Sequence, residues 1–200
     1  MRLLLLGLAA LAGVPAAETA PAVADRQAAL IQAIDASTAL GDPVKAFAKA
    51  KLVPLTTQAV WVAEVTAQNA KAVPLADIKA TDAAWQKAED ELPIQKEKTT
   101  NACAVAVKAV AKDLPALREV FVMDNQGANV GQNALTSDYW QGDEEKFTGS
   151  FKGGAGGVDV GKVKFDKSAN SNLQQISLPI IAADGSVIGA VCFGVAVDAL

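Results

Sequence analysis

The spacing of apolar residues divides the chain into two parts. From about residue 22 to residue 114, apolar residues recur every three or four positions among Ala, Lys, Glu and Gln, as at Val60, Trp61 and Val65. This spacing predicts amphipathic helices. After Pro115, β-branched residues alternate with polar ones between glycines, which is typical of strands. The sequence therefore predicts a helical N-terminal part followed by a sheet.

Proline and glycine set the ends of the predicted helices, because proline lacks an amide hydrogen and disfavours helical backbone in the residue before it. The predicted breaks lie at Gly41–Pro43, Pro54, Val73-Pro74 and Leu92-Pro93. Between and after them, the pattern predicts a short helix over Leu75–Asp90 and a longer one over Ile94–Leu114.

Five strands and one helix are predicted after Pro115. The strands lie at Glu119–Asp124, Ala128–Gln132, Val158–Phe165, Asn172–Ile181 and Val187–Val197. Asp184-Gly185 before the last strand is a hairpin signal. The helix, Asp143–Phe151, begins with acidic residues that suit the positive end of a helix dipole. This order predicts an α+β fold with a single antiparallel sheet, on which the N-terminal helices pack.

The first sixteen residues have the pattern of a secretory signal. Met1–Ala16 contains one basic residue, an apolar run and small residues at Val14 and Ala16. The run is shorter than the roughly 20 residues that span a bilayer. We therefore expect a cleaved signal peptide over residues 1–16 and a soluble periplasmic protein. Residues 17–114 form the helical segment and residues 115–200 the sheet, as one structural unit.

Cys103 and Cys192 are the only cysteines. The predicted compartment permits a disulfide. Cys103 shares a helical stripe with Val107 and Val110, however, and cysteine commonly packs in a core as a small apolar residue. Two buried free thiols are expected, and a Cys103–Cys192 disulfide is the alternative.

Composition narrows the possible functions. The chain has no histidine, which excludes histidine bases, Ser-His-Asp triads and histidine metal sites. Two cysteines are too few for a zinc site. With 18 basic and 22 acidic residues, no basic surface for nucleic acid is expected. The glycine run Gly153–Gly157 lacks the Lys-Ser/Thr of a phosphate-binding loop. We expect no metal and no cofactor.

An aromatic pair stands in an acidic segment, TSDYWQGDEEKF. The aromatic content is only 5%, and Tyr139, the sole tyrosine, precedes Trp140. The neighbouring carboxylates are Asp138, Asp143, Glu144 and Glu145. We interpret the last three as the first turn of a helix. The two rings offer apolar contact and hydrogen-bond donors, as a small-molecule pocket requires. Alternatively, Trp140 plugs the sheet and Tyr139 caps a turn.

Four segments between about Leu117 and Val197 resemble the extracytoplasmic Cache (PDC) sensor domains. They read FVMDNQGANVGQNALTSDYWQGDEEKF, VDVGKVKFD, QQISLPII and DGSVIGAVCFGVAV. The TSDYWQGDE run resembles that of stand-alone periplasmic members. The resemblance implies a PAS-like five-stranded antiparallel sheet packed by a long N-terminal helix. It also implies a pocket on one sheet face for an organic acid, an amino acid or a related metabolite.

The resemblance also implies that the link between the second and third strands covers the pocket as a roof. Tyr139 and Trp140 would lie in the roof, and Asp138, Asp143 and Lys146 are charged residues that could orient a ligand. Family sensors commonly continue into membrane helices and a signalling domain, whereas this sequence ends at Leu200, soon after its last strand. We therefore expect signalling to pass through a membrane sensor or transporter.

Three functions are compatible with the sequence. The first is a non-enzymatic periplasmic binding protein for a small metabolite. The second is an interaction module without a ligand, in which the N-terminal helices dock on another protein. A homodimer is compatible with both. The third is an enzyme that uses carboxylates such as Asp138 and Asp143.

Overall fold

The computed structural model describes residues 22–166 and 171–200. The expected signal peptide at residues 1–16 lies outside the described residues. No helix in the described part of the chain combines the length and apolar content that a membrane crossing needs.

Six α-helices precede the sheet in the described residues, and the predicted helical character of this part of the chain is confirmed. They are α1 (Val23–Ala36), α2 (Asp42–Phe47), α3 (Ala59–Ala70), α4 (Leu75–Lys87), α5 (Pro93–Thr100) and α6 (Ala102–Asp113). A π-helical turn (Ala48–Leu52) and a 3-10 turn (Val53–Thr57) connect α2 to α3. The predicted breaks are confirmed where α2 follows Gly41, α4 follows Pro74 and α5 begins at Pro93.

The single helix predicted over Ile94–Leu114 is wrong, because Asn101 divides it into α5 and α6. Asn101 has extended backbone angles, φ −68° and ψ 175°. Its side-chain oxygen accepts the backbone N–H of Ala104 at 2.8 Å, and its amide nitrogen donates to the carbonyl of Val130 at 2.7 Å. The side chain thus caps α6 and fixes it to the sheet, which continuous helix would not allow.

The sheet is antiparallel, with the order β2-β1-β6-β5-β3, and β4 also pairs with β5. The strands are β1 (Leu117–Met123), β2 (Asn129–Gln132), β3 (Asp159–Val160), β4 (Lys164–Asp166), β5 (Ser171–Ile181) and β6 (Val187–Ala196). One further helix, α7 (Glu145–Phe151), lies between β2 and β3. The predicted α+β class and antiparallel sheet are confirmed.

The third predicted strand, Val158–Phe165, is divided into β3 and β4. Gly161 still donates its N–H to the carbonyl of Gln175 at 2.8 Å, and ladder pairing resumes only at Lys164 with Leu173. The alternating pattern predicted one continuous strand here. Val163 and Phe165 are 50% and 59% exposed, so no apolar layer holds this edge segment flat against the sheet.

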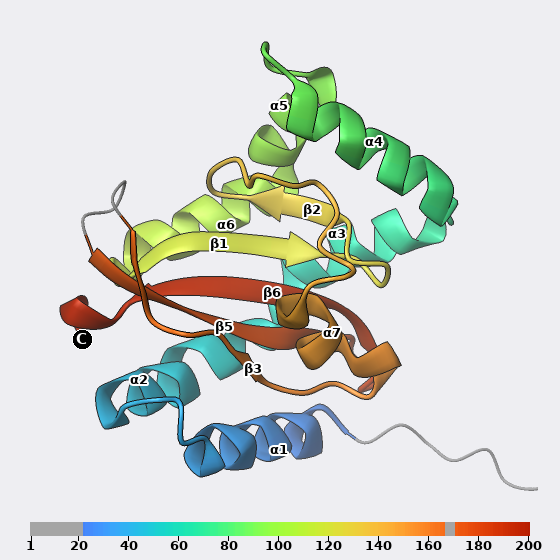
Figure 1. Cartoon of the computed structure of the whole chain (residues 1–200). Helices are drawn as coiled ribbons and strands as arrows, with labels where there is room; N and C mark the ends of the chain where they lie inside the picture. The colour runs from blue at the N-terminus through green and yellow to red at the C-terminus, as the bar shows by residue number, and fades with distance from the viewer. Residues whose placement is uncertain (1–21, 167–170) are drawn as a thin grey trace, which may run out of the picture.

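The two faces of the sheet are covered differently (Figure 1). Helices α1, α2, α3 and α6 pack on one face, where Trp61, Val107 and Phe193 belong to the main core. Helix α7 covers part of the other face, where Phe147 packs with Phe121 and Cys192. α4 and α5 lie beyond the β2 edge.

The two cysteines lie on opposite faces of the sheet. Cys103 on α6 belongs to the main core, and Cys192 on β6 belongs to the cluster under α7. Both are free and buried, and burial raises the pKa of each thiol to about 12. The prediction of two buried free thiols is confirmed.

Candidate functional site

The link between β2 and α7, residues 133–144, runs beside the turn that joins β1 to β2 (Figure 1). Trp140 forms an isolated antiparallel bridge with Ala128. The carbonyl of Tyr139 accepts the N–H of Asn129 at 3.0 Å, and Gln141 donates its N–H to the carbonyl of Gly127 at 2.8 Å. These bonds place the aromatic pair at the β2 edge, whereas the resemblance implied a roof over the sheet face.

We call residues 133–144 the linker. Helix α4 makes hydrogen bonds to its outer side. The Oδ1 atom of Asp82 accepts the backbone N–H groups of Tyr139 at 2.8 Å and Trp140 at 3.0 Å. The indole N–H of Trp85 donates to the carbonyl of Thr136 at 2.9 Å. Three bonds from α4 therefore fix the middle of the linker.

The inner side of the linker packs on buried amides. The side-chain nitrogen of Asn129 donates to the hydroxyl of Thr136 at 2.8 Å, and that of Gln141 donates to the carbonyl of Asp138 at 2.8 Å. Within the described residues, Asn129 Oδ1, Gln132 Nε2 and Gln141 Oε1 are buried and have no hydrogen-bond partner. A buried polar atom without a partner costs about 1–3 kcal/mol.

Tyr139 belongs to the core. Its ring packs against Trp85, with 5.6 Å between the ring centroids, and it shares a cluster with Ile78 and Ala128. Burial raises the pKa of the phenol above its ordinary value, and the carboxylate of Asp124 adds to the shift. This packing anchors the linker to α4.

Trp140 is half-buried and fixed at its indole edge. Its Nε1 donates to the carbonyl of Gln126 at 2.7 Å. Gly142 packs against the same edge, since a Cβ atom there would lie 2.3 Å from Trp140 Nε1. Across one ring face, the ammonium of Lys79 on α4 lies 4.4 Å from the ring centroid, a cation–π contact.

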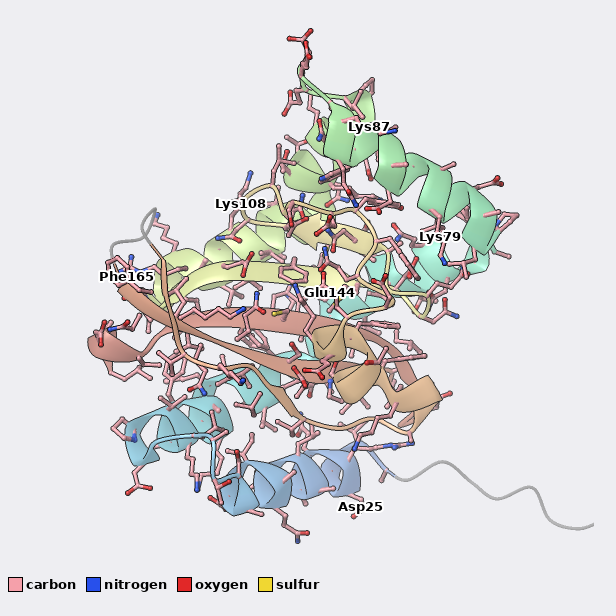
Figure 2. All side chains as sticks on the ribbon, in the orientation of Figure 1. Asp25, Lys79, Lys87, Lys108, Glu144 and Phe165 are labelled. Carbon is pink, nitrogen blue, oxygen red and sulfur yellow. The ribbon has the colours of Figure 1, made fainter. Side chains whose placement is uncertain are left out.

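A cavity of about 550 Å³ lies between α4 and the linker, and we call it the linker cavity. It is lined by Lys79, Asp82, Gln86, Asp138, Trp140, Asp143 and Glu144. Figure 2 shows Lys79 on α4 and Glu144 at the start of α7. The walls thus combine one indole, one amide, one ammonium and four carboxylates.

A second cavity, of about 480 Å³, lies over the sheet beside α7, and we call it the sheet cavity. It is lined by Glu119, Glu144, Lys146, Gly161, Lys162, Lys164, Phe165, Leu173 and Gln175. An overlapping hollow extends it to Asp143, Glu145 and Asp159. Glu144 lines both the sheet cavity and the linker cavity.

The charged groups of the sheet cavity are held by contacts with one another and with the sheet. Lys146 Nζ lies 3.0 Å from Glu144 Oε2 and 5.5 Å from the ring centroid of Phe121. Gln175 Nε2 donates to Glu119 Oε2 at 3.0 Å. Burial raises the pKa of Asp159, Glu145 raises it further and Lys146 opposes the rise. The cavity therefore holds positive and negative groups side by side, so it could bind a molecule that carries either charge.

The structure separates the residues that the sequence singled out. Asp138, Trp140 and Asp143 line the linker cavity, Lys146 lines the sheet cavity, and Tyr139 lies in the core. Sequence reasoning missed the wall residues from α4 and from the sheet strands. These are Lys79, Asp82 and Gln86 on α4, and Glu119, Lys164, Phe165, Leu173 and Gln175 on the strands. No signal in the sequence marks them, because only tertiary packing brings them to the linker.

No family model and no curated protein matches the sequence. Among solved structures, the chain is similar to the sensor domain of the Vibrio cholerae histidine kinase DctB, at 14% identity and a TM-score of 0.45, with 88% of this chain and 54% of that chain covered. It is also similar to the ligand-binding domain of the Campylobacter jejuni chemoreceptor Tlp3 in complex with 4-methylisoleucine, at 18% identity and a TM-score of 0.38, with 80% and 65% covered. The chain thus spans about half to two thirds of the length of these solved chains.

Proposed function

We propose that the chain is a non-enzymatic, extracytoplasmic binding domain for a small metabolite, located in the periplasm, and that it acts through a membrane sensor or transporter. The observation that carries the proposal is that one segment, the linker with the start of α7, lines both cavities. The signal-like sequence of residues 1–16 and the Cache-like motif of the linker support the same function.

The sheet cavity is the proposed metabolite site. Its volume of about 480 Å³ lies in the usual range for small-molecule sites, roughly 300–1,000 Å³. The Lys146 ammonium, whose side chain is 17% exposed, can bind a ligand carboxylate. Glu119 and Gln175 line the same cavity and offer an acceptor and an amide. An organic acid or an amino acid fits this set of groups.

Ligand binding would reach the linker through Glu144. This carboxylate is paired with Lys146 at 3.0 Å, so a ligand carboxylate at Lys146 competes with it. Because Glu144 also lines the linker cavity, its release would change the outer surface beside α4. That surface is where we propose that a membrane partner detects the bound state.

A thermal-shift screen with organic acids and amino acids tests the function directly, because a ligand that binds only the folded state raises the melting temperature. For each hit, calorimetry would compare Lys146→Met with Lys51→Met, a matched loss of an exposed lysine on the helical side. We expect Lys146→Met to weaken binding by about tenfold or more, from the loss of a charge-assisted bond. Equal affinity of the two variants would contradict the site, and a screen without hits would contradict the function.

A further inference from the structure

The linker cavity contains an aromatic surface that the metabolite proposal does not use. Trp140 is fixed at its edge by the bond to Gln126 and by the close approach of Gly142, so the indole keeps its position without a ligand. A rigid ring beside a cavity of about 550 Å³ is preorganised for a ligand that binds to its face.

The protein's own side chain shows which chemistry suits this face. The ammonium of Lys79 lies 4.4 Å from the ring centroid of Trp140, within the distance at which an indole attracts a cation. Lys79 is exposed, and the ion pairs within residues 22–166 and 171–200 do not include it. Its long side chain is therefore held there weakly, and a cation from solution could take its place.

The surrounding charge favours a positive ligand. Glu144 is paired with Lys146, and one oxygen of Asp82 is used by two backbone amides. Asp138 and Asp143 also line the cavity, and Lys79 is its only cationic wall residue among the described residues. Among the described residues, no three Asp, Glu or Cys side chains lie close enough together to hold a metal ion. The indole face instead suits an organic cation.

We propose that the linker cavity is a second binding site, distinct from the sheet cavity, for a small organic ammonium ion that displaces Lys79 from the face of Trp140. The ligand places its cationic centre over the indole, and Asp138 and Asp143 balance its charge. Trp140, Lys79 and Asp138 line the linker cavity and not the sheet cavity, so the contact with the indole face can be tested without the metabolite.

Choline is the probe, and 3,3-dimethylbutan-1-ol, its uncharged isostere, is the matched control ligand. Titrations of protein labelled with ¹⁵N-tryptophan would follow the three indole signals. We expect choline to shift the Trp140 signal, and the buried Trp61 and Trp85 to shift less. The uncharged isostere should bind at least about fivefold more weakly, as the loss of a cation–π contact implies.

Three variants complete the test. Trp140→Leu should weaken choline binding at least about fivefold, and Asp143→Asn, at an exposed position, should weaken it about twofold. Lys79→Met removes the competing ammonium and should tighten binding, whereas Lys87→Met, at the exposed end of α4 (Figure 2), should leave it unchanged. Equal binding of the isostere, no shift of the Trp140 signal, or no gain in Lys79→Met would overturn the proposal. None of these results would affect metabolite binding that depends on Lys146.

Discussion

The carboxylate of Asp82 on α4 accepts the backbone N–H of Trp140 in the linker at 3.0 Å, across 58 positions of sequence. The same oxygen accepts the N–H of Tyr139 at 2.8 Å. One carboxylate oxygen thus satisfies two neighbouring amides of a segment with no regular secondary structure. This contact positions part of the wall of the linker cavity. Trp140 donates one of the two hydrogen bonds, and Asp138 directly precedes Tyr139, which donates the other.

Asp82→Ala should destabilise the fold by about 1–3 kcal/mol, since two backbone amides lose a charged acceptor. Hydrogen exchange should locate the effect in the linker, with faster exchange of the Tyr139 and Trp140 amides. Asp82→Asn is the matched control, because it keeps an oxygen acceptor and should lose less. If the alanine variant exchanged like the wild type at both amides, the contact would not hold the linker.

Gly142→Ala should displace the Trp140 indole. The new Cβ would lie 2.3 Å from Trp140 Nε1 and 2.5 Å from the carbonyl oxygen of Gln126, so the bond between those two atoms cannot persist. We expect a loss of about 1–3 kcal/mol in the free energy of unfolding, typical of overpacking. The measurement is urea unfolding together with the chemical shift of the Trp140 indole.

The control for this variant is Gly41→Ala. A Cβ atom at Gly41 would have its nearest neighbour at 4.0 Å, and the backbone φ of −71° suits alanine. Its cost should stay below about 1 kcal/mol, the value of a weakened helix N-cap. Equal losses in the two glycine variants would show that the packing of the indole edge contributes nothing.

Which segments are helices and which are strands could be predicted from the local sequence pattern. The wrong element boundaries arose where tertiary contacts of single side chains decide the structure. Pro74 precedes the first residue of α4 and Pro93 is the first residue of α5, positions where a missing amide hydrogen costs a helix nothing. Asn101 is a residue that can cap a helix, but a lone Asn within a helical pattern does not show that it will accept the Ala104 N–H while it donates to the carbonyl of Val130 on β2. Alternation over Val158–Phe165 predicted one strand, but Val163 and Phe165 are exposed, so apolar packing does not hold this part of the edge in the ladder.

The positions of the candidate site residues could be predicted in part, for the same reason. Asp138, Trp140 and Asp143 are close in sequence, so their shared cavity could be expected. Tyr139 was misplaced, because neighbouring residues in extended backbone point to opposite sides and only packing against Trp85 decides which side is buried. Lys79 and Asp82 could not be identified, since nothing in the sequence of α4 shows that it lies against the linker.

Cys103 and Cys192 should resist thiol reagents in the native protein. Both are 0% exposed, and burial raises the pKa of each thiol to about 12, so the reactive thiolate is scarce near pH 8. Mass spectrometry after N-ethylmaleimide treatment should show no label in buffer. In guanidinium without reductant it should show one label on each cysteine. Absence of label in guanidinium would mean that the two cysteines form a disulfide.

The stability of the protein should depend on Asp159 in a pH-dependent way. Burial raises the pKa of this carboxyl above 3.8 in the folded state, and Glu145 adds to the rise. In the pH range between the ordinary and the raised value, the folded state binds more protons than the unfolded state. Stability from this group is therefore present at low pH and is lost as the pH rises through the folded pKa.

Asp159→Asn should accordingly raise the melting temperature at pH 7, where the wild type carries a half-buried negative charge that is disfavoured beside Glu145. The gain should shrink as the pH falls toward 3.8, because the wild-type carboxyl becomes protonated and resembles the amide. Asp184→Asn is a control for which we expect the opposite change in melting temperature. Its carboxylate accepts hydrogen bonds from Ser186, which lower its pKa, so that variant should be less stable at pH 7. A gain for Asp159→Asn that stays constant from pH 7 to pH 4 would show that the effect is not one of charge.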